Sequence, residues 1–207
     1  MDKRIHVLFL IDILYGLAGA EGALLRMTRL LPRDRYRCTV ATFRARREVV
    51  ELFDCPVIVF PLEKAFSLQS IDRAIRLYRF IRDERVSVVH TFFQAADLWG
   101  GLVSRLRRRL VLISSRRDLG FMRSPKQRIA YRMLGRFYDQ VQAVSDEVRQ
   151  YSIAADGLDP EKVITVPNGI ELDESGRDRA SVRKELGIGM DAPVVISVGH
   201  IRYIKGT

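Results

Sequence analysis

The sequence predicts an α/β protein built on a doubly wound, parallel sheet. Apolar runs of strand length alternate along the chain with segments whose apolar residues recur at helical spacing. This alternation is typical of parallel sheets with helical crossovers. The strand-length runs are almost continuous in valine, isoleucine and leucine, as expected where helices cover both faces of a sheet.

In the first half of the chain, apolar spacing and proline define the elements. The run Ile5–Ile11 has strand length, and the helical stripe after it ends just before Pro32, which would stop a helix. The same reasoning predicts strands at Ile5–Ile11, Tyr36–Phe43, Val57–Phe60 and Val86–His90, and helices at Ala20–Leu31, Ser70–Arg85 and Gln94–Arg108.

The second half repeats the pattern and adds signals for helix starts. Pro125 suits the first turn of a helix, and Ser145 is a good N-cap before a first turn with two acids. We expect strands at Leu110–Ser114, Gln140–Val144 and Lys162–Val166, and helices at Pro125–Phe137 and Asp146–Tyr151.

The composition then becomes polar, which predicts a domain boundary. Residues 1–170 would form the first domain, and residues 171–191, with a short helix ending at Leu186, a connection. Residues 192–207 would begin a truncated second α/β domain with a strand at Val194–Val198.

The chain carries 35 lysine and arginine residues against 25 acids, for a net charge of +10. Such a surface favours anionic partners: nucleotides, acidic lipid head groups or nucleic acid. The first apolar run is too short to span a membrane, and Cys38 and Cys55 suit a reducing compartment. We therefore expect a cytoplasmic protein.

The loop after the first strand contains Gly16, Gly19 and Gly22. Glycine lets the backbone approach a ligand beside a helix N-terminus, which attracts anions. The spacing does not match the dinucleotide fingerprint G-x-G-x-x-G. An NADP site remains open because arginines follow the second strand at positions 44, 46 and 47, and a tight turn without a ligand is the structural alternative.

The C-terminal loop, Gly199–Gly206, places Arg202 and Lys205 three residues apart. If this loop curls over the strand end, both cations reach one diphosphate. The order lysine-glycine-threonine disfavours a Walker loop, which needs glycine before lysine. A solvated basic loop is the alternative.

Polar residues also follow other strands. His90 closes a strand at the carboxyl edge, where α/β proteins bind ligands, although a structural histidine explains it equally well. Arg116 and Arg117 would hold an anionic substrate or pair locally with Asp118. No H-E-x-x-H, D-x-D or G-x-S-x-G motif occurs, so the sequence predicts neither a catalytic metal nor a hydrolase.

Two basic segments, 105–109 and Phe121–Tyr138, mix arginine with apolar side chains. They would lie against anionic lipid, as a peripheral contact with the inner face of a membrane, or form ordinary solvated surface. The arginines at positions 73, 76, 79 and 82 spread around their helix, which does not favour nucleic-acid binding.

Five short motifs occur in register: Ala18-Gly19-Ala20-Glu21, Val88-Val-His90-Thr, Ala143-Val-Ser145-Asp-Glu-Val, Val166-Pro-Asn168-Gly169-Ile and Val198-Gly-His-Ile-Arg202-Tyr-Ile-Lys205-Gly206. With these motifs the chain resembles the retaining GT-B glycosyltransferases of family 4, nucleotide-sugar enzymes with two Rossmann-like domains. Ala18 replaces the first glycine of the family's G-G-A-E loop.

The resemblance implies that the first, Rossmann-like domain binds mainly the acceptor, a saccharide or a lipid-linked molecule. The second domain would bind the nucleoside-diphosphate sugar, with Arg202 and Lys205 on the diphosphate and amides around Gly19 on the opposite wall. It implies no metal or other cofactor, because cations and amides neutralise the leaving diphosphate. The candidate cleft residues are Glu21, His90, Arg117, Asn168 and Gly169.

Two departures from the family pattern matter. Many relatives carry histidine where this chain has Arg117, which leaves the catalytic residue unknown. The family's second domain should continue past Thr207 with a pair of glutamates, so we expect these 207 residues alone to lack transferase turnover. The alternatives are another GT-B enzyme, such as a nucleotide-sugar epimerase, and a non-catalytic basic Rossmann module that docks on a membrane or partner.

Overall fold

The computed structural model describes residues 3–17, 19–62, 68–121, 123–170 and 176–196. The chain divides into two compact units, Met1–Gly169 and Ile170–Thr207, and each is considered by itself. The roles predicted for residues 1–170, 171–191 and 192–207 stay predictions.

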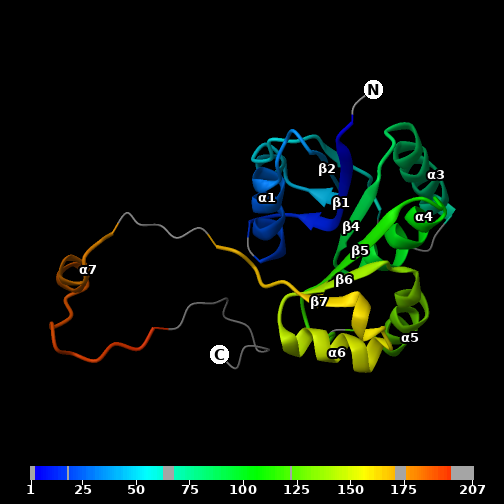
Figure 1. Ribbon diagram of the computed structural model, residues 1–207. Helices are drawn as coiled ribbons and strands as arrows, with labels where there is room; N and C mark the ends of the chain where they lie inside the picture. Colours follow the sequence, from blue (N-terminus) through cyan, green and yellow to red (C-terminus); the bar gives the residue numbers. More distant parts are fainter. Residues whose placement is uncertain (1–2, 18, 63–67, 122, 171–175, 197–207) are drawn as a thin grey trace. The chain divides into compact units, whose positions relative to one another are not determined.

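Among the described residues, the first unit holds a sheet of seven parallel strands in the order β3-β2-β1-β4-β5-β6-β7 (Figure 1). The order runs outward from β1 in both directions, which confirms the predicted doubly wound, Rossmann-like sheet. The strands are β1 Ile5–Leu14, β2 Tyr36–Ala45, β3 Val57–Val59, β4 Val88–Phe92, β5 Val111–Arg116, β6 Gln140–Ala143 and β7 Val163–Thr165.

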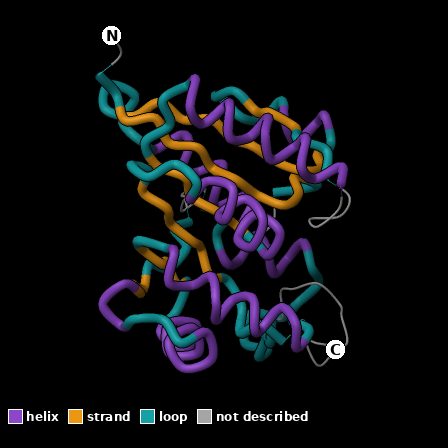
Figure 2. The backbone as a smooth tube through the Cα atoms, turned by 90° about the vertical axis from the view of Figure 1, so that its right-hand side faces the viewer, coloured by secondary structure: helices purple, strands orange, loops and turns teal. Residues whose placement is uncertain are grey.

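Helices cover both faces of the sheet, with α1 on one side and α3 and α4 on the other (Figures 1 and 2). The α-helices of the first unit are α1 Ala20–Leu30, α2 Arg47–Val50, α3 Leu68–Asp83, α4 Gly101–Arg105, α5 Pro125–Leu134 and α6 Asp146–Asp156. A π-helix spans Ala96–Gly100, and short 3-10 helices span Gly135–Phe137 and Pro160–Lys162. The second unit contains α7, Arg179–Glu185.

Alternating side chains along β1 divide the core into two layers. Phe9 and Ile11 pack with α1 on one face, and Leu8 and Leu10 pack with α3 and α4 on the other. All four are at most 1% exposed. Burial on both faces is the physical reason for the almost continuous apolar strands of the sequence.

Both predicted helix starts are confirmed. The Ser124 hydroxyl accepts a bond from the Gln127 amide, and the Gln127 side chain accepts one from the Ser124 amide, which makes a capping box just before Pro125. At the start of α6, the Ser145 hydroxyl accepts a hydrogen bond from the amide of Val148.

Two elements near β4 differ from the prediction. The strand expected at Val86–His90 lies two residues later. The reason is that Arg85 leaves α3 in a left-handed conformation, with φ 51°, and the Val86 amide still bonds to the carbonyl of the helix residue Ile81. The single helix expected at Gln94–Arg108 is divided between the π-helix and α4.

In the second unit, residues 193–196 form no strand, although the sequence predicted one at Val194–Val198. A strand needs a neighbour for its backbone hydrogen bonds, and within the described ranges no segment pairs with this one. Residues 197 and 198 lie outside the described residues.

The adjacent strands β1 and β4 mark the point where the sheet reverses its winding. From β1 the chain crosses to β2, and from β4 it continues in the opposite direction to β5. Open α/β sheets bind ligands in the crevice beyond the carboxyl ends of such strands, so the fold places a candidate site there.

Candidate functional site

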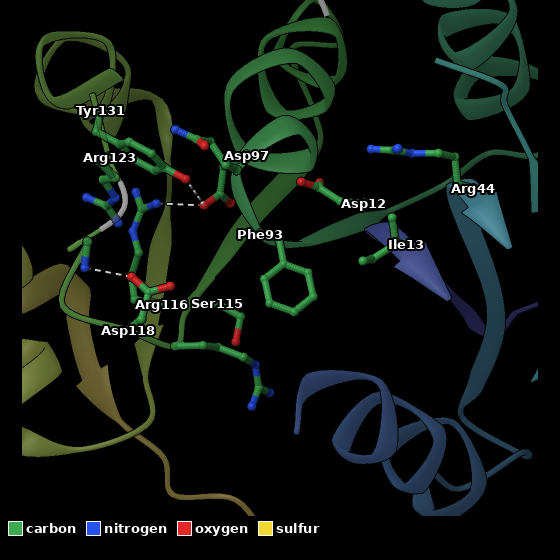
Figure 3. Close-up of a pocket in the computed structure, with 13 residues that line it drawn as sticks. Asp12, Ile13, Arg44, Phe93, Asp97, Ser115, Arg116, Asp118, Arg123 and Tyr131 are labelled. Atoms are coloured by element: carbon green, nitrogen blue, oxygen red, sulfur yellow. Dashed lines mark hydrogen bonds and ion pairs between the residues drawn. The ribbon is translucent and has the colours of Figure 1, made fainter. Parts of the chain in front are cut away.

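A pocket of about 310 Å³ opens at the carboxyl ends of β1, β4 and β5, beside this reversal point. Asp12 and Arg44 lie on one side of it, and Arg116, Arg123 and Tyr131 lie on the opposite side (Figure 3). Most of the lining residues are polar or charged, and Ile13, Phe93 and Tyr131 add apolar surface between them, a mixture that is typical of ligand sites.

Asp97, in the π-helix, is the centre of the polar network and is 2% exposed. Its carboxylate oxygens accept hydrogen bonds from Thr91 (2.6 Å), Ser114 (2.8 Å), Tyr131 (3.0 Å) and Arg116 (2.6 Å). Burial raises the pKa of Asp97, while the charge of Arg116 and these hydroxyl donors oppose the rise. Because all four groups donate to it, Asp97 acts as a buried carboxylate.

Two arginines share the ring of Tyr131. The guanidinium carbon of Arg116 lies 4.2 Å from the ring centroid and that of Arg123 lies 3.8 Å from it. Arg123 donates bonds of 2.9 and 3.1 Å to Asp156, whose carboxylate also lies 3.9 Å from Arg116 Nε. Two carboxylates therefore balance the buried Arg116 and the partly buried Arg123.

Asp12 connects the end of β1 to the helical segment after β4. Its carboxylate accepts bonds from the amides of Ala95 (2.9 Å) and Ala96 (2.6 Å). Burial raises the pKa of Asp12 to about 6, against the lowering effect of these amides; Asp97 raises it further and Arg44 lowers it. A carboxyl group that titrates near neutrality in a pocket is suited to proton exchange with a ligand hydroxyl.

Phe93, the residue after β4, has φ 69°, in the left-handed region that bulky residues avoid. Its ring lies in the pocket between the two polar sides (Figure 3). Such strain costs about 1–3 kcal/mol and is concentrated at functional sites. The ring gives the pocket one flat apolar surface among its charges.

The structure brings four of the predicted cleft residues together around Arg117. Arg117 Nη1 donates a 2.6 Å hydrogen bond to Asn168 Oδ1. Burial raises the pKa of Glu21, and the charge of Arg117 opposes this rise. The charge of Arg117 also lowers the pKa of His90. Gly169 directly follows Asn168 in the chain. These residues come from α1, β4, the end of β5 and the segment after β7.

His90 is not the last residue of its strand, which continues to Phe92. The ring is 5% exposed, and its centroid lies 4.6 Å from that of Phe92 and 5.8 Å from that of Phe9. Burial lowers the pKa of His90 to about 3, and Arg117 adds to this effect. A role for the neutral ring at the cleft stays a prediction.

The loop after β1 packs tightly against the first turn of α1. Gly19 has φ 57° and ψ −112°, a conformation that favours glycine. A Cβ atom on Gly22 would lie 2.3 Å from the carbonyl oxygen of Leu17. The glycines thus allow the loop backbone to pack closely on the helix backbone beside the reversal point. Binding of phosphate near Gly19 remains a prediction.

The remaining predicted residues have different outcomes. Arg202 and Lys205 lie outside the described residues, so their contact with a diphosphate stays a prediction. Arg116 and Arg117 both line the pocket. The local alternative is wrong: within the described ranges Arg116 pairs with Asp97 and Asp156, and Asp118 accepts a hydrogen bond from the amide of Gly120.

The sequence reasoning missed Asp12, Asp97 and Phe93 as site residues. For two of them the sequence contains an indication, a charged residue within an apolar run. Asp12 interrupts an apolar strand, and Asp97 is a single acid in an apolar helical segment. A charge in such a place must be paired if it is buried. The sequence contains no indication for Phe93, because its backbone conformation cannot be read from the residue type.

The family model of Glycosyltransferase Family 4 matches residues 17–174. The chain belongs to glycosyltransferase family 4. D-inositol 3-phosphate glycosyltransferase of Geodermatophilus obscurus is 39% identical over 62 residues, which are 30% of this chain and 14% of that protein.

Solved structures of other proteins share the fold. Anabaena Alr3699/HepE in complex with UDP has a TM-score of 0.71 at 22% identity, covering 88% of this chain and 50% of that one. A UDP-N-acetylglucosamine 2-epimerase has a TM-score of 0.59 at 13% identity, covering 80% of this chain and 49% of that one. The family 4 chain therefore spans about half the length of the solved structures that it matches.

The part of this family 4 chain that the structure describes contains no group of three or more histidine, cysteine, aspartate or glutamate side chains placed to hold a metal ion. In the same residues, no helix combines the length and apolar character needed to cross a membrane.

Proposed function

We propose that the whole protein transfers a sugar, a hexose or a related one, from a nucleoside-diphosphate sugar to a saccharide or lipid-linked acceptor, with retention at the anomeric carbon. The observation that carries the proposal is a polar pocket at the reversal point of a domain that belongs to glycosyltransferase family 4. Structures of Alr3699/HepE with UDP and with UDP-glucose support a nucleoside-diphosphate donor.

In this proposal the first unit binds the acceptor in the pocket beside Asp12 and Phe93. The amides near Gly19, together with Arg202 and Lys205, neutralise the diphosphate as it leaves, so the reaction needs no metal or other cofactor. Helix N-termini and arginine both stabilise phosphate oxygens through charge-assisted hydrogen bonds.

The test is a transfer assay with the whole protein and a panel of nucleoside-diphosphate sugars. Release of the nucleoside diphosphate that depends on an added acceptor would support the proposal. Formation of an epimeric nucleotide sugar without an acceptor would instead support the epimerase alternative, for which the UDP-N-acetylglucosamine 2-epimerase fold is the supporting observation. Anomeric configuration of the product, read by NMR, tests retention.

A second proposal is peripheral contact with the inner face of a membrane from the cytoplasm. Helix α5 exposes Ile129 (60%) and Met133 (58%) beside the exposed cations Arg128 and Arg132. An exposed apolar ridge flanked by arginines fits the interface of an anionic bilayer. Cosedimentation with phosphatidylglycerol vesicles at low salt tests it, with the variant Arg128→Gln/Arg132→Gln expected to bind less. Absence of binding would overturn this proposal and leave the transferase proposal untouched.

A further inference from the structure

The two cysteines of the chain lie close together, at the same end of two adjacent parallel strands. Cys38 lies in β2, two residues before Val40. Cys55 lies two residues before Val57, where β3 begins. Val40 pairs with Val57, and the Val40 amide donates a 2.9 Å hydrogen bond to the carbonyl of Pro56. Side chains two residues apart share a face of a strand, and both cysteines pack against the core layer that α1 covers.

This placement fits the geometry of a disulfide. Neighbouring strands lie about 4.7–4.9 Å apart, and the two Cα atoms of a disulfide lie about 4.4–6.8 Å apart. The charge of an ionised Cys38 raises the pKa of Cys55, as expected for neighbouring thiols. Both cysteines are free, and the sequence contains no others. A disulfide within this chain can therefore join only Cys38 and Cys55.

Both cysteines are half-buried and line a pocket of about 160 Å³, called here the thiol pocket. The charged side chains that line it are three arginines and one acid: Arg4, Arg33, Arg37 and Asp54. Burial raises the pKa of both thiols, and the charge of Arg33 opposes this rise. The positive balance of the lining attracts a reactant that carries carboxylates.

We infer that Cys38 and Cys55 form a modification site, which an anionic disulfide of low molecular weight, such as oxidised glutathione, converts to a reversible disulfide. First, the Cys38 sulfur attacks one sulfur of the reactant, whose S–S bond breaks and releases one thiol. Next, the Cys55 sulfur attacks the Cys38 sulfur, the protein disulfide forms and the second thiol leaves. The protons of both cysteines end on the released thiols. The cysteines lose two electrons in total, and the reactant gains them.

The surroundings of the two thiols set the order of attack. Burial, together with the charges of Cys38 and Asp54, raises the pKa of Cys55 to about 11, whereas burial alone raises that of Cys38. The thiolate is the attacking form, so Cys38 reacts first. Because both thiols are mostly protonated near neutral pH, the pair stays reduced in a reducing compartment and reacts only when disulfides accumulate.

Incubation of the reduced chain with oxidised glutathione at mildly alkaline pH tests the inference. We expect mass spectrometry of the intact monomer to show the loss of two hydrogen atoms and no bound glutathione, and dithiothreitol to reverse the change. The bond closes residues 39–54 into a loop, so the oxidised chain should melt about 5–10 °C above the reduced chain. Two glutathiones on one chain, a disulfide between two chains, or no reaction overturns the inference.

Single-cysteine variants test the order of attack. Cys55→Ser should stop with one glutathione on Cys38, because the second sulfur is missing. Cys38→Ser should react about tenfold more slowly than Cys55→Ser, because less of Cys55 is thiolate. Neither variant should gain thermal stability on treatment. Faster reaction of Cys38→Ser overturns the role of Cys38 as the first nucleophile.

The charge of the thiol pocket is tested with cystamine, a disulfide that carries two amines in place of carboxylates. Oxidised glutathione should react about fivefold faster than cystamine at low salt, and high salt should reduce this difference. Arg33→Gln should slow oxidised glutathione about twofold. The matched control Arg79→Gln, which removes an exposed charge on α3, should react as the wild type does. Equal rates for the two disulfides overturn the assignment to an anionic reactant.

Discussion

Arg116 Nη1 lies 2.6 Å from Asp97 Oδ2, and the two side chains are 2% and 3% exposed. An ion pair this deeply buried is weak evidence for stability, because both charges lose their hydration. Removing one partner is costly, because the remaining charge is left buried and unpaired.

Asp97→Asn should therefore lower the free energy of unfolding by about 3–5 kcal/mol, measured by urea denaturation. The matched control is Glu51→Gln, which breaks the exposed pair of Arg47 and Glu51 and should cost less than about 1 kcal/mol. Equal losses in the two variants would contradict the importance of burial at Asp97.

Gly22→Ala should destabilise the chain by about 1–3 kcal/mol. The new Cβ would lie 2.3 Å from the carbonyl oxygen of Leu17, and backbone cannot move aside as a flexible side chain does. This clash should outweigh the gain of up to about 1 kcal/mol that alanine brings to a helix. Gly16→Ala meets no atom within 4 Å and should change the unfolding free energy by less than about 0.5 kcal/mol. Similar results for both glycines would refute the close loop packing.

Asp12 should make the chain less stable as the pH rises through weakly acidic values. Its pKa is raised from 3.8 to about 6 in the folded chain, so between these values the folded state binds a proton that the unfolded state has lost. The contribution of Asp12 to the unfolding free energy then falls by about 2 kcal/mol from pH 4 to pH 6, out of about 3 kcal/mol over the whole pH range. Carbon-detected NMR of the carboxyl group should give a midpoint near pH 6, and Asp83, whose pKa an adjacent Arg82 lowers, serves as the reference in the same spectra.

His90 should have the opposite effect on the pH dependence of stability. Burial lowers its pKa from 6.5 to about 3, so on acidification the unfolded chain takes up a proton before the folded chain does, and stability is lost as the pH falls below 6.5. The effects of Asp12 and His90 should largely cancel between about pH 6 and pH 4. The Asp12→Asn variant should therefore lose stability on acidification more steeply than the wild type. A His90 midpoint near pH 6.5 by NMR would overturn this expectation.

The sheet was predictable from the sequence because strands buried on both faces consist almost entirely of apolar residues. Helix α2, Arg47–Val50, was not predicted, since four residues are too few to show a helical period. Among the site residues, Glu21, His90 and Asn168 were selected by family motifs and Arg117 by its place after a strand. The structure groups the first three around the Arg117 guanidinium.

The Asp97 network could not be predicted, because it depends on which side chains face one another. Thr91 and Ser114 are small polar residues in strands, and the sequence does not show that they lie opposite each other when β4 and β5 pair. Tyr131 comes from a different crossover helix. Only the tertiary arrangement shows that a single acid accepts hydrogen bonds from five side chains.

The π-helix at Ala96–Gly100 makes this charge arrangement sensitive to chain length. A π turn holds one residue more than an α turn, and each residue of an α-helix turns the following side chains by about 100°. Deleting Leu98 would restore regular winding and rotate either Asp97 or the buried Trp99 out of its place. Homologues of equal length in this segment can keep the buried carboxylate. In homologues one residue shorter, another group must neutralise the charge of the arginine at the position of Arg116.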